Sequence, residues 1–158
     1  MTSLHFSQDI IDFLSALSRH DVKYVIVGGG AVIYYGYPRL TGDMDIFYDP
    51  EEDNSHGLYN ALNDFWDNSI PGIESYHELM EENVIIQFGT PPNRIDLLNH
   101  ISGVTFPEAW KSHVEEKIDS KGHMISINYI SLENLIKNKQ AIRRNKDMDD
   151  LKYLESIK

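Results

Sequence analysis

Two aspartates, Asp43 and Asp45, stand two positions apart in the short apolar stretch DMDIFY. Side chains in a β-strand alternate between the two faces, so both carboxylates lie on one face, roughly 7 Å apart along the chain. Two neighbouring carboxylates repel each other unless a positive charge lies between them. Carboxylate oxygens are ligands that divalent cations such as Mg²⁺ prefer, so the pair predicts a metal site.

A third carboxylate, Asp96, lies in the later apolar stretch 94–98, which also has the composition of a strand. Burying an unpaired carboxylate is costly, so Asp96 needs a partner. One candidate is Arg94 on the same face, and the other is a metal shared with Asp43 and Asp45. Because those two aspartates need a cation themselves, they favour the shared metal.

Three glycines, Gly28 to Gly30, directly follow an apolar strand expected at 22–27. Glycine lets the backbone turn sharply and approach a ligand closely. A helix beginning at 31–35 would point its free N–H groups toward a phosphate held at this turn. A tight strand-to-helix turn without any ligand explains the glycines equally well. A dinucleotide fingerprint is not present, since Ile33 stands where it needs glycine. A Walker loop is not present either, since the chain has no Gly-Lys-Ser or Gly-Lys-Thr.

Three further residues are candidates for contact with a substrate phosphate. Arg39 either pairs with an acid or with such a phosphate, or is an ordinary surface arginine. Thr41 either tethers its loop or contacts substrate. Lys139 lies on the buried stripe of an expected helix, where a packing residue belongs, so its ammonium either snorkels outward or points at an anion. Asp147 and Asp150, in contrast, are expected to cap the last helix.

The apolar pattern predicts the elements that position these side chains. We expect helices at about 8–20, 55–67, 74–82, 106–114 and from 131 onward, and strands at 22–27, 43–48, 84–88, 94–98 and 124–130. Ser7 and Ser131 are expected N-caps, and the acidic residues 51–54 are expected to form a solvated loop. This order predicts an α/β (α+β) fold, a mixed β-sheet flanked by helices, with a helical C-terminal tail.

Composition narrows the class of protein. The 158 residues favour a single domain spanning 1–158. Absence of cysteine, of a long apolar run and of a secretory signal leads us to expect a cytoplasmic protein without membrane contact. A net charge of −11 opposes broad binding to nucleic acid. Residues 137–146 nevertheless hold five of the 14 lysines and arginines, a local patch suited to polyphosphate or a short stretch of RNA.

Taken together, these features resemble the nucleotidyltransferase superfamily, whose members include polymerase beta, the kanamycin nucleotidyltransferases and minimal bacterial nucleotidyltransferases. The family pattern is an apolar residue before two small residues, a short helix, an Asp-x-Asp strand and an acid on a later strand. The matching segments here are Val27-Gly28-Gly29, Asp43-Met44-Asp45 and Ile95-Asp96-Leu97. The run from the glycines to Asp45, and the tail from Ser131 to Leu151, are similar to a bacterial branch that includes relatives of AbiEii-type toxins.

The resemblance implies Mg²⁺-dependent transfer of a nucleoside monophosphate from an NTP to an acceptor hydroxyl, with release of pyrophosphate. Asp43 and Asp45 would hold two Mg²⁺ ions and Asp96 would complete the site, so that all three are metal ligands and catalytic residues. The residues expected to bind the nucleotide are Gly28, Gly29, Arg39, Thr41 and Lys139. The acceptor is a small molecule, a protein or RNA, and a protein partner encoded by a neighbouring gene is a further possibility.

Two other functions use the same residues differently. A regulatory module that keeps the fold without turnover, such as a toxin–antitoxin component, would leave Asp96 facing away from Asp43 and Asp45. A magnesium phosphohydrolase would use carboxylates but has no need of the glycine turn. The chain also departs from the family at Gly29, where a serine often stands, so no hydroxyl can hold phosphate there.

Overall fold

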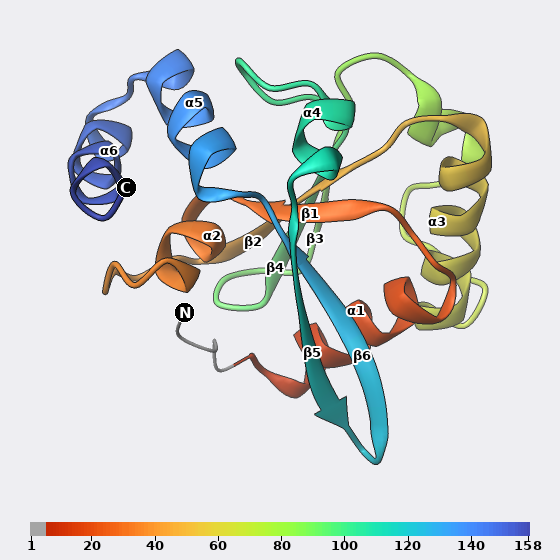
Figure 1. Ribbon diagram of the computed structural model, residues 1–158. Coiled ribbons are helices and arrows are strands. Elements are labelled where there is room, and N and C mark those ends of the chain that lie inside the picture. Colours follow the sequence, from red (N-terminus) through yellow and green to blue (C-terminus); the bar gives the residue numbers. More distant parts are fainter. Residues whose placement is uncertain (1–5) are drawn as a thin grey trace.

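The computed structural model describes residues 6–158 as a mixed sheet with helices on both sides (Figure 1). The strands are β1 (Tyr24–Val27), β2 (Asp43–Tyr48), β3 (Ile85–Phe88), β4 (Arg94–Leu98), β5 (Val114–Ser120) and β6 (His123–Tyr129). The helices are α1 (Gln8–Arg19), α2 (Gly28–Tyr34), α3 (Glu52–Phe65), α4 (Phe106–Lys111), α5 (Leu132–Ile142) and α6 (Asn145–Ser156), with a 3₁₀ helix at Tyr76–Met80. This architecture confirms the fold class predicted from the sequence.

The sheet has six strands in the order β3-β4-β2-β1-β6-β5. β1 is parallel to β6 and β2 is parallel to β4, whereas the other neighbouring pairs are antiparallel. β2 and β4 therefore lie side by side in the interior of the sheet. This pairing matters for function because both strands carry the predicted site carboxylates.

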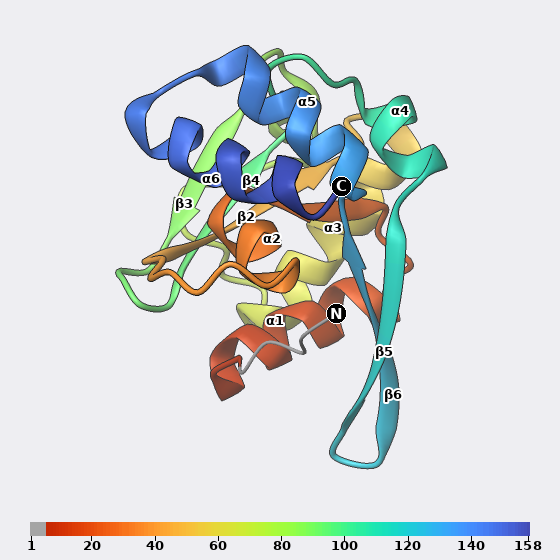
Figure 2. The ribbon, with the colours of Figure 1, turned by 60° about the vertical axis from the view of Figure 1, so that its left-hand side comes forward.

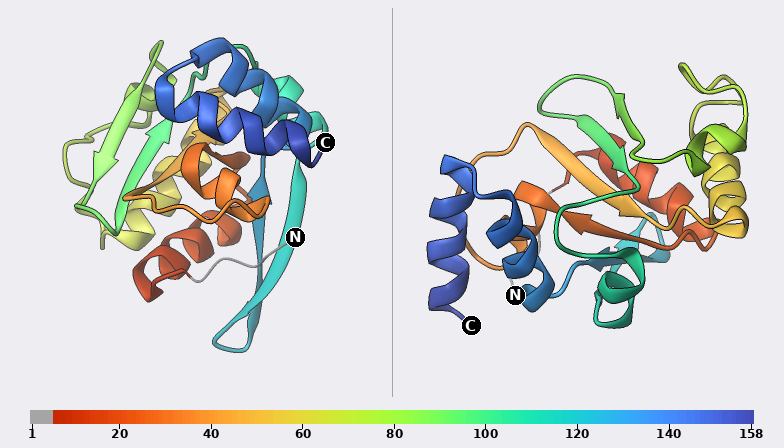
Figure 3. Two further views of the ribbon diagram at one scale, coloured as in Figure 1. Left: turned by 90° about the vertical axis from the view of Figure 1, so that its left-hand side faces the viewer. Right: turned by 90° about the horizontal axis from the view of Figure 1, so that it is seen from above.

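The two faces of the sheet are covered by different helices (Figures 2 and 3). α1 and α3 lie together on one side, and α4, α5 and α6 lie on the other. Met44, Ile46 and Tyr48 of β2 are buried, and strand alternation directs them away from the face that carries Asp43 and Asp45. β1 is buried along its whole length, as its uninterrupted apolar sequence requires.

The predicted N-caps are confirmed: the Ser7 hydroxyl accepts from the Ile10 amide and the Ser131 hydroxyl accepts from the Asn134 amide. The expectation of a solvated loop at 51–54 is wrong, since α3 already begins at Glu52. Glu52 and Asp53 occupy its first turn, where the partial positive charge of the helix N-terminus stabilises acidic side chains. Sequence periodicity alone misses this beginning because no apolar residue marks it.

A long hairpin formed by β5 and β6 projects from the body of the protein (Figures 1 and 2). The sequence predicts β6 but not β5, and it wrongly extends the preceding helix to Val114. β5 is an edge strand of polar composition, with Glu115, Glu116 and Lys117 in succession and exposed. Because it buries little apolar surface, it lacks the alternation by which a strand is recognised.

Among the residues that the structure describes, no helix is long and apolar enough to cross a membrane.

Candidate active site

The structure brings Asp43, Asp45 and Asp96 together on one face of the sheet. Asp45 and Asp96 are direct partners in the register of β2 and β4. One carboxylate oxygen from each of the three residues lies within 4.8 Å of the others. Asp96 is buried and the other two are partly exposed. Three carboxylate oxygens this close together are a donor set suited to a hard divalent cation.

Asp96 forms an ion pair with Arg94, one of the two partners that the sequence left possible for it. Nε and Nη2 of Arg94 lie 3.1 Å from the two carboxylate oxygens of Asp96, in the bidentate geometry that guanidinium groups favour. Nη2 also lies 3.1 Å from Oδ2 of Asp43. The guanidinium therefore neutralises part of the negative charge of the three carboxylates.

The three carboxyl groups perturb one another. Burial, and after it the neighbouring carboxylates of Asp43 and Asp96, together raise the pKa of Asp45 to about 7. Burial also raises the pKa of Asp96, although Arg94 opposes this shift. For Asp43 burial is outweighed by hydrogen bonds with Asp45 and Asp96 and by the charge of Arg94, so its pKa is lowered. Asp45 thus keeps its proton at pH values where a carboxyl group is usually ionised.

Gly28 and Gly29 allow this cluster to lie against the backbone. α2 begins at Gly28 itself, three residues earlier than the helix expected from the sequence. Gly28 has a φ of +62°, and a Cβ at this position would collide with Oδ2 of Asp45. A Cβ on Gly29 would lie 2.7 Å from Oγ1 of Thr41. Both glycines therefore leave room for side chains of the candidate site.

Replacing Gly28 by alanine is expected to displace Asp45 and to weaken Mg²⁺ binding by about 10- to 100-fold, the range seen when the support of a metal ligand is disturbed. Gly72→Ala is the matched control, because Gly72 also has a positive φ of +75° but a Cβ there meets nothing within 4 Å. Both variants carry similar backbone strain, about 1 kcal/mol. Calorimetric titration with Mg²⁺ measures the difference, and equal losses in the two variants would contradict this role of Gly28.

Arg39 and Thr41 hold the loop that precedes β2. The Thr41 hydroxyl donates to the main-chain oxygen of Asp43 at 3.1 Å, so it tethers the loop as one of the two expected possibilities. Nε of Arg39 lies 3.1 Å from Oδ1 of Asp150, while its Nη2 would lie 3.0 Å from a Cβ on Gly29. Arg39 therefore connects α6 to the glycine turn.

Lys139 is buried, with only 2% of its side chain exposed, and its ammonium does point at anions. These anions belong to the chain itself: Nζ lies 2.8 Å from Oδ1 of Asp147 and 3.1 Å from Oδ2 of Asp150. Asp147 also accepts from the Arg144 guanidinium at 2.6 Å. A role of Lys139 in nucleotide binding stays a prediction, since these carboxylates already engage its ammonium.

Of the two residues expected to cap α6, Asp147 does so and Asp150 does not. Asp147 caps the helix by accepting from the main-chain amide of Arg144 at 3.1 Å. Asp150 does not cap; it lies one turn into α6 and forms ion pairs with Arg39 and Lys139. Burial acts to raise the pKa of Asp147, but Arg144 and Lys139 outweigh it and lower that pKa to about 2.

A cavity of about 470 Å³ opens in front of the carboxylate cluster. Its walls include all three aspartates, Gly28 and the cationic side chains Arg94, Lys139, Arg144 and Lys146. The sequence indicated the basic patch at 137–146, which includes Arg144 and Lys146, but from that patch it proposed only Lys139 as a nucleotide-binding residue. The cavity has the size of a small-molecule site, and both carboxylate and cationic side chains line it.

Comparison with known proteins gives one family. A family model described as "Nucleotidyltransferase of unknown function (DUF6036)" matches residues 7–157. A search of curated proteins finds none with significant similarity to this chain. The match covers the glycine turn, all three aspartates and both C-terminal helices.

Proposed function

Since this chain belongs to the family of nucleotidyltransferases of unknown function, we propose that it is a Mg²⁺-dependent enzyme that transfers a nucleoside monophosphate from an NTP to an acceptor hydroxyl. The observation that carries the proposal is the cluster of three carboxylates within 4.8 Å, set in a cavity with cationic walls. A regulatory module without turnover would have no need to bring Asp96 to the other two acids.

The residues present fit a divalent cation. Asp43, Asp45 and Asp96 offer hard oxygen ligands from neighbouring strands, whose backbone fixes the separation of the side chains. Burial and the charges of Asp43 and Asp96 raise the pKa of Asp45, and a bound cation would stabilise its ionised form. We propose that Asp43 and Asp45 hold two Mg²⁺ ions and that Asp96 completes the site.

The proposed reaction forms one bond and breaks another at the α-phosphorus. The acceptor oxygen bonds to this phosphorus while the bond to the bridging oxygen breaks, which releases pyrophosphate. Bound Mg²⁺ would supply positive charge that lowers the pKa of the acceptor hydroxyl and neutralises the leaving group. Asp96 is the candidate that accepts the proton of the hydroxyl. Arg94 now pairs with Asp96 and Asp43, and it would have to release them for these carboxylates to hold metal ions.

The cationic wall of the cavity is suited to the triphosphate. Arg144 and Lys146 line the cavity, and both are exposed at its edge. Arg39 lies at the glycine turn, where its contact with Asp150 orients the guanidinium. We propose that Gly28 and Gly29 admit the phosphates and that Arg39, Thr41 and Lys139 form or support the binding surface.

A transfer assay tests this function. The protein is incubated with each α-labelled NTP, Mg²⁺ and candidate acceptors, including small metabolites, proteins, total RNA and the protein itself. We expect label on an acceptor together with pyrophosphate. Asp96→Asn should lower the rate by about 10²-fold or more, because it removes a charged ligand and the proposed base.

Asp53→Asn is the matched control for this assay, since Asp53 is an exposed acid in the first turn of α3, away from the cluster. It should transfer at the rate of the unmodified protein. Release of orthophosphate without any labelled acceptor would indicate a phosphohydrolase instead. Undiminished transfer by Asp96→Asn would show that the cluster is not the active site.

A further inference from the structure

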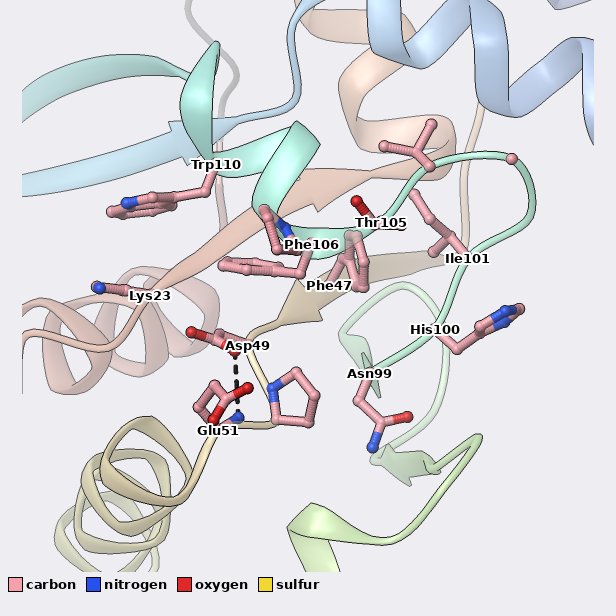
Figure 4. A pocket seen from close by; sticks show the side chains of 14 residues that line it. Lys23, Phe47, Asp49, Glu51, Asn99, His100, Ile101, Thr105, Phe106 and Trp110 are labelled. Carbon is pink, nitrogen blue, oxygen red and sulfur yellow. Dashed lines mark hydrogen bonds between the residues drawn. The ribbon is translucent and has the colours of Figure 1, made fainter.

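A second cavity, of about 650 Å³, lies under the loop that connects β4 to α4 (Figure 4). Three aromatic side chains, Phe47, Phe106 and Trp110, line it. The Phe47 and Phe106 rings meet edge to face with centroids 5.3 Å apart, and Phe106 stacks with Trp110 at 5.9 Å. This volume is typical of small-molecule sites, and such aromatic walls provide flat apolar contact.

This second cavity adjoins the carboxylate cluster. Phe47 follows Asp45 by two positions on β2, so the two side chains lie on the same face of the sheet, roughly 7 Å apart along the strand. His100 and Ile101 line both cavities. A molecule held against the aromatic wall therefore lies beside the candidate active site.

The charges around the second cavity favour a cation. Asp49 and Glu51 line it, and Figure 4 shows both side chains beside the cavity, below Phe47. Asp49 Oδ1 accepts from the Glu51 amide at 3.1 Å; within residues 6–158, neither Oδ2 of Asp49 nor the Glu51 carboxylate has a hydrogen-bond or ion-pair partner. Lys23 is the one charged cation of the wall, which leaves a net charge of −1 with His100 neutral.

Aromatic faces add to this preference, because they attract cations through the negative charge of the ring faces. A polyanion such as RNA would be repelled at this cavity, because the two carboxylates and the protein's net charge of −11 are also negative.

We propose that the second cavity binds the acceptor, and that this acceptor is a small hydroxylated organic cation with a flat apolar ring. The ring lies against Phe47, Phe106 and Trp110, the cationic group lies near Asp49 and Glu51, and the hydroxyl points toward Asp45. Asp49 directly follows β2 and is four positions from Asp45, a distance of about 13 Å along extended chain that is suited to a substituted ring system. The acceptor role rests on the proposed function, whereas the charge preference of the cavity does not.

A binding experiment without Mg²⁺ or NTP tests the charge preference. Trp110 and Trp66 are the two tryptophans of the chain, so in a Trp66→Phe background Trp110 is the single indole reporter. The probes are tyramine, p-cresol and 4-hydroxyphenylacetate, which share a hydroxylated ring but are cationic, neutral and anionic. We expect tyramine to quench Trp110 fluorescence with a Kd at least about tenfold lower than the anion, a difference of ~1.4 kcal/mol.

Two variants with opposite expected effects control this experiment. Asp49→Asn combined with Glu51→Gln should reduce the preference for tyramine to within about threefold. Lys23→Gln should increase the preference, because it removes the positive charge of the wall. These residues are exposed or partly exposed, and asparagine keeps the oxygen that accepts from the Glu51 amide. Thermal melting verifies that each variant folds.

The outcomes separate this inference from the proposed function. Equal binding of the three probes, or no quenching up to ~10 mM tyramine, overturns the inference. Quenching by a single-stranded oligonucleotide at lower concentration than by tyramine also overturns it, since it would assign the cavity to nucleic acid. Cation-selective binding that both sets of variants shift as expected supports the inference. Absence of nucleotide transfer to every acceptor would then count against the proposed function and the acceptor role that rests on it, but not against the charge preference of the cavity.

Discussion

Replacing Asp45 by asparagine should slow nucleotide transfer strongly and at the same time make the protein more stable in the absence of Mg²⁺. The loss of activity follows from removal of a charged metal ligand, and we expect a decrease of about 10³-fold, equivalent to ~4 kcal/mol of transition-state stabilisation. The gain in stability follows from the pKa of Asp45, which burial and the neighbouring carboxylates raise from 3.8 to about 7.

The sign of this effect depends on where the proton is held. Between about pH 4 and pH 7 the folded protein keeps the proton of Asp45, whereas the unfolded chain has lost it. The free energy of unfolding therefore falls as the pH rises through this window, and Asp96 shifts in the same direction. Asparagine does not ionise, so the variant should be more stable by about 2–4 kcal/mol above pH 7 and similar to the unmodified protein near pH 4.

Thermal unfolding in EDTA at a series of pH values measures this difference. About 2–4 °C per kcal/mol is expected for a chain of this size. Addition of Mg²⁺ should raise the midpoint of the unmodified protein but not that of Asp45→Asn. Asp53→Asn serves again as the control and should follow the unmodified protein at every pH. An Asp45→Asn variant less stable than the unmodified protein above pH 7 would contradict the charge balance described for the cluster.

Lys139→Ala should be among the most destabilising single substitutions in this chain. Asp147 and Asp150 are almost fully buried, and each lies close to the Lys139 ammonium. Removing one partner of a buried charge cluster leaves the remaining charge uncompensated, which typically costs 3–5 kcal/mol, so we expect a loss of about that size. Arg144 still contacts Asp147 and Arg39 still contacts Asp150, which keeps the loss from being larger.

The neighbouring lysine provides the control. Lys137 lies two positions away on α5 and pairs with Glu108 at 2.6 Å, but both side chains are about half exposed. An exposed ion pair contributes at most about 1 kcal/mol, so Lys137→Ala should have a small effect. Urea unfolding of both variants without nucleotide gives the comparison. Similar free energies of unfolding for the two variants would show that Lys139 does not stabilise the tail.

The central part of the site could be predicted because short-range patterns determine it. Strand alternation places Asp43 and Asp45 on one face, and the cost of burying Asp96 requires a partner for it. That Asp96 lies directly beside Asp45 follows from the pairing of β2 with β4, which depends on the whole sheet. The need of a buried carboxylate for a partner suggests that Asp96 belongs with the other acids, but it contains no information on the register of the strands.

The partners of the charged residues were harder to predict for a related reason. The position of Lys139 on the apolar stripe of α5 indicates that its ammonium needs an anion, and the same reasoning left phosphate and carboxylate open. The structure supplies carboxylates from α6, which packs against α5 after a turn at Arg143 in the left-handed region. The exposed strand β5 escaped prediction because its polar residues obey no alternation that burial would impose.

Because the carboxylate cluster is built from both β2 and β4, it forms only when these two parallel strands pair in the native register. A slip of β4 by one residue would move Asp96 by about 3.3 Å and turn it to the opposite face of the sheet, among the apolar side chains. A divalent cation that binds across both strands therefore binds only the native alignment. By mass action, such a cation would shift the equilibrium from misaligned chains toward the native sheet, so its binding would stabilise the correct register of β2 and β4.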